Sequence, residues 1–239
     1  MTDMMHSISF FINRIPLLFI VLNIILLFTS WMLSTYIEVS VVRNPLNIDG
    51  VRWMVGNFMQ NIGKIPLPSI VFMLMGISVV KESGMLSHLQ RRQFLSLKQR
   101  RAIFMVVSVT IVYFIAILLV SVTYRGILYD TFGDFTNSPM CKGWILLVFT
   151  LLYIQGNIYG YSSGRFVTFL DAIEGHTKML VSAKRYFLTA VCGSMLMCTI
   201  EYTGILLLSE YAELLFVVLY FCIYYLTLFL HLKYSPRSI

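Results

Sequence analysis

The sequence predicts an all-α polytopic membrane protein with about six transmembrane helices and one amphipathic or re-entrant helix. Of the 239 residues, 58% are hydrophobic and 12% are charged, and the mean hydropathy is +0.80. A soluble domain carries roughly 25% charged residues. The apolar residues form runs near the length of about 20 residues that a helix needs to cross a bilayer. We therefore expect one integral membrane domain over residues 1–239.

The apolar runs define the predicted spans in order. The first run follows Arg14 and is too long for the apolar part of a cleaved signal peptide, so we expect it to be retained. The second run is short, and the fifth is interrupted by Glu201. The six predicted spans are 15–37, 66–80, 102–122, 143–161, 186–208 and 211–232.

The basic residues predict the orientation of these spans. Cytoplasmic loops of membrane proteins carry an excess of Lys and Arg. If the N-terminus is cytoplasmic, thirteen of the 18 Lys and Arg fall in cytoplasmic segments, most of them in 81–101 and 162–185. An even number of spans then returns the C-terminus to the same side. We expect the inner membrane of a bacterium, with both termini cytoplasmic.

Several classes of function find no support in the sequence. The formal charge of +7 comes from residues between apolar runs, so it indicates membrane orientation and no nucleic-acid partner. The four cysteines have no CxxC spacing, which favours packing residues over a disulfide or zinc site. Metalloprotease, serine-hydrolase and phosphate-binding motifs are missing. We expect no enzyme, no metal and no cofactor.

Residues 46–62 are too polar for a span and too apolar for an ordinary loop. Apolar residues recur there at helical spacing, beside a polar face. One interpretation is an amphipathic helix that packs at the outer membrane surface. The other is a lid or substrate vestibule, whose candidate residues are Arg52, Trp53, Asn57 and Asn61.

The end of the fourth predicted span is rich in glycine and polar residues. Gly156 and Gly160 form a GxxxG pair, which lets helices approach closely in lipid. The alternative is a broken helix whose freed backbone lines a cavity, as in transporters. On that alternative the transport path is lined by Gln155, Gly156, Asn157, Gly160, Ser162 and Ser163.

Two acidic stretches complete the candidate residues. Glu201 lies about seven residues, or roughly 10 Å, from the outer end of the fifth predicted span. An intramembrane acid needs a partner, and Tyr202 and the tyrosines of the sixth span are the expected hydroxyl partners, because no Lys or Arg is expected at matching depth. It is either a proton carrier or a hydrogen-bonded packing residue. The second stretch, 170–178, brings Asp171, Glu174 and His176 together, and we expect a solvated helix end rather than a metal site.

Three segments resemble the AbgT family of p-aminobenzoyl-glutamate transporters. They are "DGVRWMVGNFMQN" (49–61), "VFMLMGISVVKESGMLSHLQRR" (71–92) and "GNIYGYSSGRFVTFLDAI" (156–173). The resemblance covers about the first three quarters of the chain and matches the N-terminal part of the family. It implies proton-driven movement of small aromatic carboxylates such as aminobenzoyl-glutamate.

These observations leave two main hypotheses. The first is an AbgT-like transporter that works as a homo-oligomer in the lipid bilayer, with Glu201 carrying a proton. The second is a non-transporting scaffold or assembly subunit that binds another membrane protein through the aromatic residues of the sixth span. An intramembrane enzyme is the third and least supported alternative.

Overall fold

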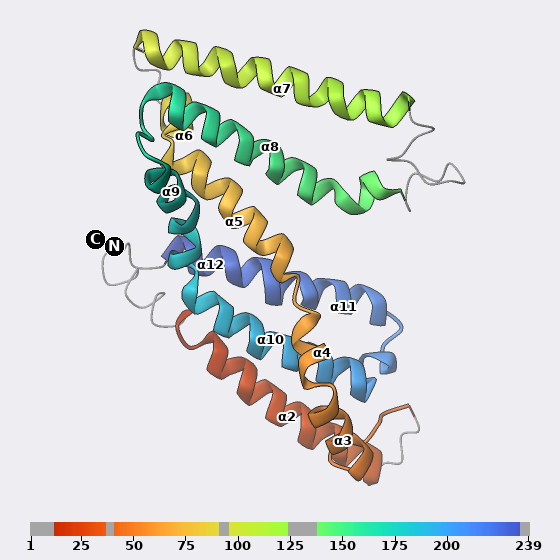
Figure 1. Ribbon diagram of the computed structural model, residues 1–239. Helices are drawn as coiled ribbons and strands as arrows, with labels where there is room; N and C mark the ends of the chain where they lie inside the picture. Colours follow the sequence, from red (N-terminus) through yellow and green to blue (C-terminus); the bar gives the residue numbers. More distant parts are fainter. Residues whose placement is uncertain (1–11, 37–40, 91–95, 124–137, 235–239) are drawn as a thin grey trace. The chain divides into compact units, whose positions relative to one another are not determined.

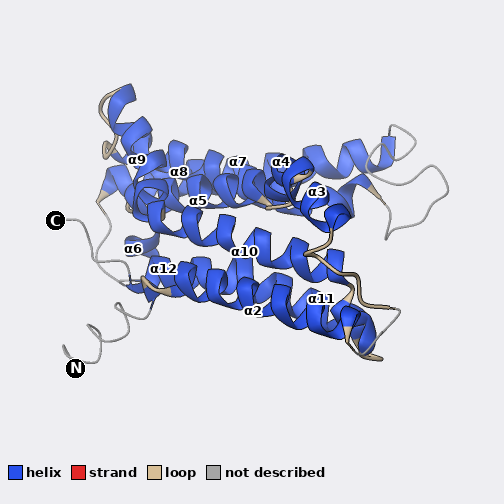
Figure 2. Ribbon diagram, turned by 90° about the horizontal axis from the view of Figure 1, so that it is seen from below, coloured by secondary structure: helices blue, strands red, loops and turns tan. Residues whose placement is uncertain are grey.

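The computed structural model describes residues 12–36, 41–90, 96–123 and 138–234 (Figure 1). These residues form helices and turns, and no strand occurs among them (Figure 2). The chain divides into two compact units, one of residues 1–67 and 182–239 and the other of residues 68–181. We describe each unit by itself, as unit 1 and unit 2.

The first half of the chain contains six described helices. They are α2 (Ile15–Thr35), α3 (Ile48–Gly56), α4 (Phe58–Gly63), α5 (Leu67–Glu82), α6 (Met85–Gln90) and α7 (Leu97–Thr123). The second half contains α8 (Pro139–Ser163), α9 (Phe169–Ser182), α10 (Lys184–Thr203), the 3-10 turn η1 (Ile205–Leu208), α11 (Ala212–Phe221), the π-helical turn η2 (Cys222–Leu226) and α12 (Thr227–Tyr234).

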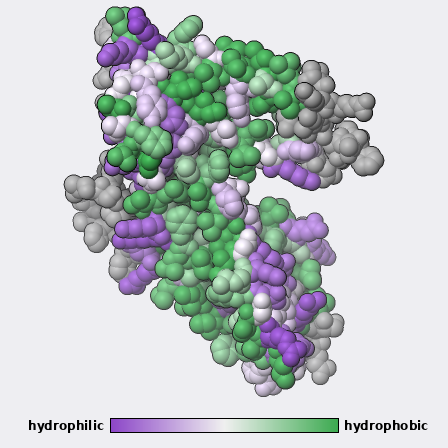
Figure 3. Space-filling view, in the orientation of Figure 1, coloured by the Kyte–Doolittle hydropathy of each residue, from purple (hydrophilic) through white to green (hydrophobic). Residues whose placement is uncertain are grey.

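Five of the described segments are helical, long and apolar enough to cross a membrane, which confirms the all-α polytopic membrane class. They are Ile15–Thr35, Phe58–Glu82, Leu97–Ser121, Pro139–Ser163 and Ala212–Tyr234. Large apolar side chains such as Phe104 and Leu118 are exposed on them, as a lipid-facing helix requires. Hydrophobic residues also cover much of the face seen in Figure 3.

The second predicted span, 66–80, matches α5, and the apolar segment that contains α5 extends over Phe58–Glu82 and also includes α4. The prediction of a single amphipathic helix over 46–62 is wrong, because two helices, α3 and α4, occupy this stretch, with Asn57 between them. Residues 58–62 belong to the same apolar segment as α5. The end of the first predicted span, at residue 37, lies outside the described residues.

Unit 1 is organised around α10. Helix α2 packs along it, and α4 and α12 also contact it (Figure 1). Eleven of its 20 residues are buried. A Cβ added at Gly193 would lie 2.4 Å from the side chain of Ile223, so glycine allows the last span to approach closely. Thr199 donates to the Asn23 side chain of α2 at 3.3 Å.

The predicted fifth span, 186–208, corresponds to α10 and η1. Helix α10 ends at Thr203 because Gly204 adopts a left-handed conformation with φ of 67°. It is not one of the five segments above. Its polar residues Thr189, Ser194, Thr199 and Thr203 lower its hydropathy, and all four are buried against protein. That α10 crosses the membrane stays a prediction.

Unit 2 contains α5 to α9. Helix α8 packs along α7, where Tyr113 donates to the backbone oxygen of Leu147 at 2.9 Å. Helix α5 contacts α8 at Gly76 and α9 at Ser78. The Ser78 hydroxyl donates to Gly175 O and accepts from Met179 N, so it bridges two backbone groups one turn apart in α9. This bridge holds α9 against α5.

The start of α9 is fixed by its own side chains. Thr168 and Asp171 form a reciprocal cap in which Asp171 accepts from Thr168 N at 2.8 Å and Thr168 Oγ1 accepts from Asp171 N at 3.2 Å. The backbone N–H groups of Thr168 and Val167, followed by the Thr168 hydroxyl, lower the pKa of Asp171. Asp171 is therefore a structural cap rather than a free carboxylate.

Candidate functional site

The second span is interrupted between α4 and α5. In a continuous helix Ile65 N would bond to Asn61 O, but here it bonds to Ile62 O at 3.1 Å. Pro66 follows and has no N–H to donate. The interruption at 64–66 therefore leaves the backbone oxygen of Asn61 without its usual helical partner, and within α4 it accepts only a long bond from Lys64 N at 3.4 Å.

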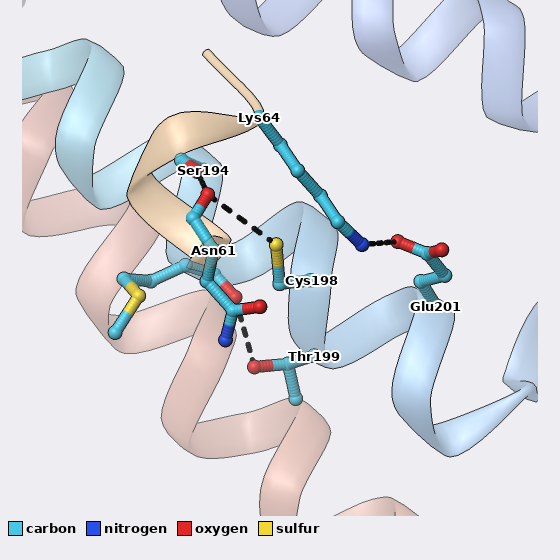
Figure 4. Close-up of polar contacts among 7 residues, drawn as sticks. Asn61, Lys64, Ser194, Cys198, Thr199 and Glu201 are labelled. Atoms are coloured by element: carbon cyan, nitrogen blue, oxygen red, sulfur yellow. Dashed lines mark hydrogen bonds and ion pairs between the residues drawn. The ribbon is translucent and has the colours of Figure 1, made fainter. Parts of the chain in front are cut away.

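Helix α10 supplies further donors to the backbone oxygen of Asn61. The Ser194 hydroxyl donates to Asn61 O, and Cys198 Sγ lies 3.7 Å from the same oxygen (Figure 4). Ser194 and Cys198 are four residues apart and so lie on one face of α10. Asn61, Ser194 and Cys198 are all buried. A break inside a membrane segment is tolerated when neighbouring side chains satisfy the freed backbone in this way.

An ion pair lies beside the break. Lys64 Nζ is 2.6 Å from Glu201 Oε2, and Figure 4 shows the two side chains pointing toward each other. The two side chains are 50% and 52% exposed. The prediction that Glu201 has no basic partner is therefore wrong. Glu201 lies in the last turn of α10, which ends at Thr203.

Helix α3 covers the same end of α10. The Trp53 ring stacks on Tyr202 with centroids 4.2 Å apart and planes inclined by 20°. Tyr202, predicted as a hydroxyl partner of Glu201, thus contributes its ring to packing. Of the four vestibule candidates, Trp53 and Asn61 contact α10. Asn57 bonds back to Trp53 O at 3.2 Å, and Arg52 is exposed.

The path candidates in unit 2 all lie on α8, which is unbroken over residues 139–163. The broken-helix interpretation of this stretch is therefore wrong. A Cβ at Gly156 would lie 2.6 Å from Val79, and one at Gly160 would overlap the Phe166 ring, so both glycines serve close packing. The two glycines therefore have the role that the helix-packing interpretation gives them.

Hydrogen bonds hold the remaining candidates on α8. Gln155 donates to Thr110 of α7 at 2.7 Å. Ser162 contacts Met105 Sδ at 3.2 Å, and Ser163 donates to Gly160 O at 3.3 Å. These three side chains therefore support the fold of unit 2. Asn157 behaves differently, because it reaches another polar side chain.

Asn157 forms a polar pair with His176 of α9. Asn157 Nδ2 lies 3.1 Å from His176 Nε2 and 2.8 Å from Tyr153 O, and His176 Nδ1 bonds to Ala172 O. A backbone oxygen only accepts, so Nδ1 carries the proton and Nε2 accepts from the Asn157 amide. His176 is 8% exposed. The prediction that it lies on a solvated helix end is therefore wrong.

Lys64 and His176 were both missed from sequence, for different reasons. Lys64 falls between Gly63 and Pro66, and its distance from Glu201 depends on how the break turns the chain. The burial of His176 had a signal in the sequence, because Ala172, Gly175 and His176 recur at positions i, i+3 and i+4 and so share one helix face. In the structure all three residues are buried. That small-residue face predicts contact with a neighbouring helix.

The polar residues do not form a metal site within the described ranges. No three His, Cys, Asp or Glu side chains gather there closely enough to hold a metal ion. The candidates fall into two groups in different units: Lys64 and Glu201 at the break, and Asn157 and His176 on α8 and α9. No protein-family model, curated protein or solved structure matches this chain.

Proposed function

We propose that this membrane protein is an AbgT-like secondary transporter that moves small aromatic carboxylates by proton coupling. It would act as a homo-oligomer in the inner membrane of a bacterium. The observation that carries the proposal is the interrupted second span, with the Lys64–Glu201 pair beside it. Discontinuous helices are a recurring way for transporters to place binding groups within the membrane. The three segments that resemble the AbgT family support the same class.

The ion pair provides a mechanism for coupling. While Glu201 is ionised, its carboxylate forms an ion pair with the Lys64 ammonium at 2.6 Å. When Glu201 takes up a proton, it loses the charge that holds the pair together, and the Lys64 ammonium is left without its counter-ion. A substrate carboxylate then replaces Glu201 as that counter-ion. One proton and one carboxylate thus bind together, and the site keeps the same net charge.

Flux through proteoliposomes tests this proposal. The purified full chain is reconstituted with an imposed pH gradient, and uptake of labelled aminobenzoyl-glutamate is measured against vesicles without protein. We expect gradient-driven uptake that Glu201→Gln abolishes, because the amide binds no proton and leaves Lys64 without a counter-ion at all times, so carboxylate binding is no longer linked to proton uptake. Glu210→Gln is the matched control, because Glu210 is an exposed acid nine residues further along the chain.

Each result of the flux experiment has a defined meaning. Uptake retained by Glu210→Gln and lost in Glu201→Gln supports the mechanism. Uptake that continues unchanged in Glu201→Gln removes Glu201 from coupling. If the well-folded wild-type protein moves no aromatic carboxylate, the transporter proposal is wrong for this class of substrate.

The scaffold hypothesis is the second candidate, and the packing of α8 favours it. Gln155, Gly156 and Gly160, which were path candidates, are occupied by contacts with α7, α5 and Phe166. A rigid helix assembly of this kind suits a subunit that holds a partner. Co-purification of a stoichiometric membrane partner without substrate flux would support this candidate over transport.

A further inference from the structure

A cavity in unit 2 has features that the transport mechanism does not use. It has a volume of about 480 Å³ and lies among α5, α8 and α9. Aromatic residues Tyr153, Tyr161 and Phe169 form part of its wall, together with several aliphatic side chains. Asn157 and His176 are its principal polar residues. Such a combination of apolar walls and few polar groups is typical of small-molecule sites.

The hydrogen bonds of the polar pair determine what the cavity offers to a ligand. His176 has both ring nitrogens engaged, one with Ala172 O and one with the Asn157 amide nitrogen. The Asn157 nitrogen is shared between His176 and Tyr153 O. In the described part of the chain, the Asn157 side-chain oxygen Oδ1 has no hydrogen-bond partner. Within the Asn157–His176 pair, Oδ1 is therefore the acceptor left for a ligand.

The charge of the lining limits the ligand further. No Lys, Arg, Asp or Glu lines the cavity, and His176 in the arrangement above is neutral. A ligand carboxylate or ammonium would lose its hydration without gaining a counter-ion. The lining thus disfavours ions, while the aromatic side chains favour a planar ring.

We propose that this cavity binds a neutral, planar aromatic molecule with one N–H or O–H group, which donates to Asn157 Oδ1. His176 acts as a positioning residue, because its Nε2 holds the amide nitrogen and so fixes which end of Asn157 is left to accept. The ligand class differs from the aromatic carboxylates of the proposed transport function. The proposal therefore stands or falls independently of transport.

Indole and 1-methylindole are suitable probes, because they share a ring system and differ at the N–H. Binding of each labelled probe to the full chain in phosphatidylcholine nanodiscs is measured by equilibrium dialysis, with empty nanodiscs as the blank. We expect indole to bind roughly fivefold to tenfold more tightly than 1-methylindole, the effect of one net hydrogen bond. Asn157→Leu should remove this preference, because it removes the accepting oxygen.

Two further variants separate the site from general effects. Gln155→Leu removes another amide from α8, one that bonds to α7 and does not line this cavity, and it should keep the preference for indole. Ile173→Trp should weaken binding of both probes by filling the cavity. If Asn157→Leu does not fold, this variant still tests whether the probes bind in the cavity. Equal binding of both probes by the wild type, or a preference that survives in Asn157→Leu, would overturn the proposal. So would unchanged binding in Ile173→Trp.

Discussion

Lys64 and Glu201 illustrate how a single residue pair links the fold to the proposed function. Both side chains are about half exposed, so their ion pair contributes little to the folded state. Its significance is that a substrate carboxylate can replace the Glu201 carboxylate beside Lys64. A pair with a small effect on stability and a large effect on flux is the signature of a functional contact.

A double-mutant cycle measures the first of these effects. We expect Lys64→Met, Glu201→Gln and the double variant to give a coupling free energy of unfolding of about 0.2–1 kcal/mol, because solvent screens half-exposed charges. Chemical unfolding in detergent, followed by circular dichroism, gives the four stabilities. A coupling above about 3 kcal/mol, typical of buried pairs, would instead assign the pair a structural role.

The sequence predicted some residues of this site and not others, for physical reasons. Glu201 stood out because an acid in an apolar run is costly without a partner. Its partner was missed because Lys64 lies 137 positions earlier in the chain, at a break whose direction no periodicity describes. Asn157 was a candidate, but the burial of His176 depends on how α9 returns against α5 and α8.

At the scale of elements, helical runs were predicted well and their interruptions poorly. The apolar runs of α2, α7 and α8 and the final span are continuous, so composition alone located them. The second predicted span, 66–80, matches α5 but leaves out α4, which belongs to the same apolar segment Phe58–Glu82. Chain breakers give the position of a break. Whether the apolar run resumes as the same span depends on partners such as Ser194.

Helix α8 provides a test of packing at this scale. We expect Gly156→Ala to destabilise the protein by about 1–3 kcal/mol, because the added Cβ would lie 2.9 Å from backbone atoms of Val79 and Val80, which cannot give way as a flexible side chain would. Gly143→Ala on the same helix has no neighbour within 4 Å. It is the matched control and should be neutral or slightly stabilising.

Thermal melting of both glycine variants in one detergent makes the comparison. Substituting alanine for glycine in a helix raises helix propensity at both positions, so any loss at Gly156 reports the contact with α5. Equal melting temperatures for the two variants would contradict the close approach of α5 and α8.

At the scale of the whole molecule, α10 decides how many times the chain crosses the membrane. It contains 20 residues, which corresponds to about 30 Å, the thickness of the hydrocarbon core. Its uncharged polar residues Thr189, Ser194, Thr199 and Thr203 are buried, and α2, α4 and α12 pack against the helix. A helix enclosed by protein can cross a bilayer with a lower hydropathy than helices that face lipid, since its polar groups are satisfied internally.

We therefore expect six crossings and both termini in the cytoplasm. If α10 did not cross, the five remaining spans would place the two termini on opposite sides. Fusions of green fluorescent protein and alkaline phosphatase after residue 239 distinguish these topologies, because the first is fluorescent only in the cytoplasm and the second active only outside it. A fusion in the connection between α2 and α3 serves as the control and should show the opposite pattern. Fluorescence at the C-terminus would establish α10 as a span, given a cytoplasmic N-terminus, whereas phosphatase activity there would place α10 on one side of the membrane and remove Glu201 from any path across it.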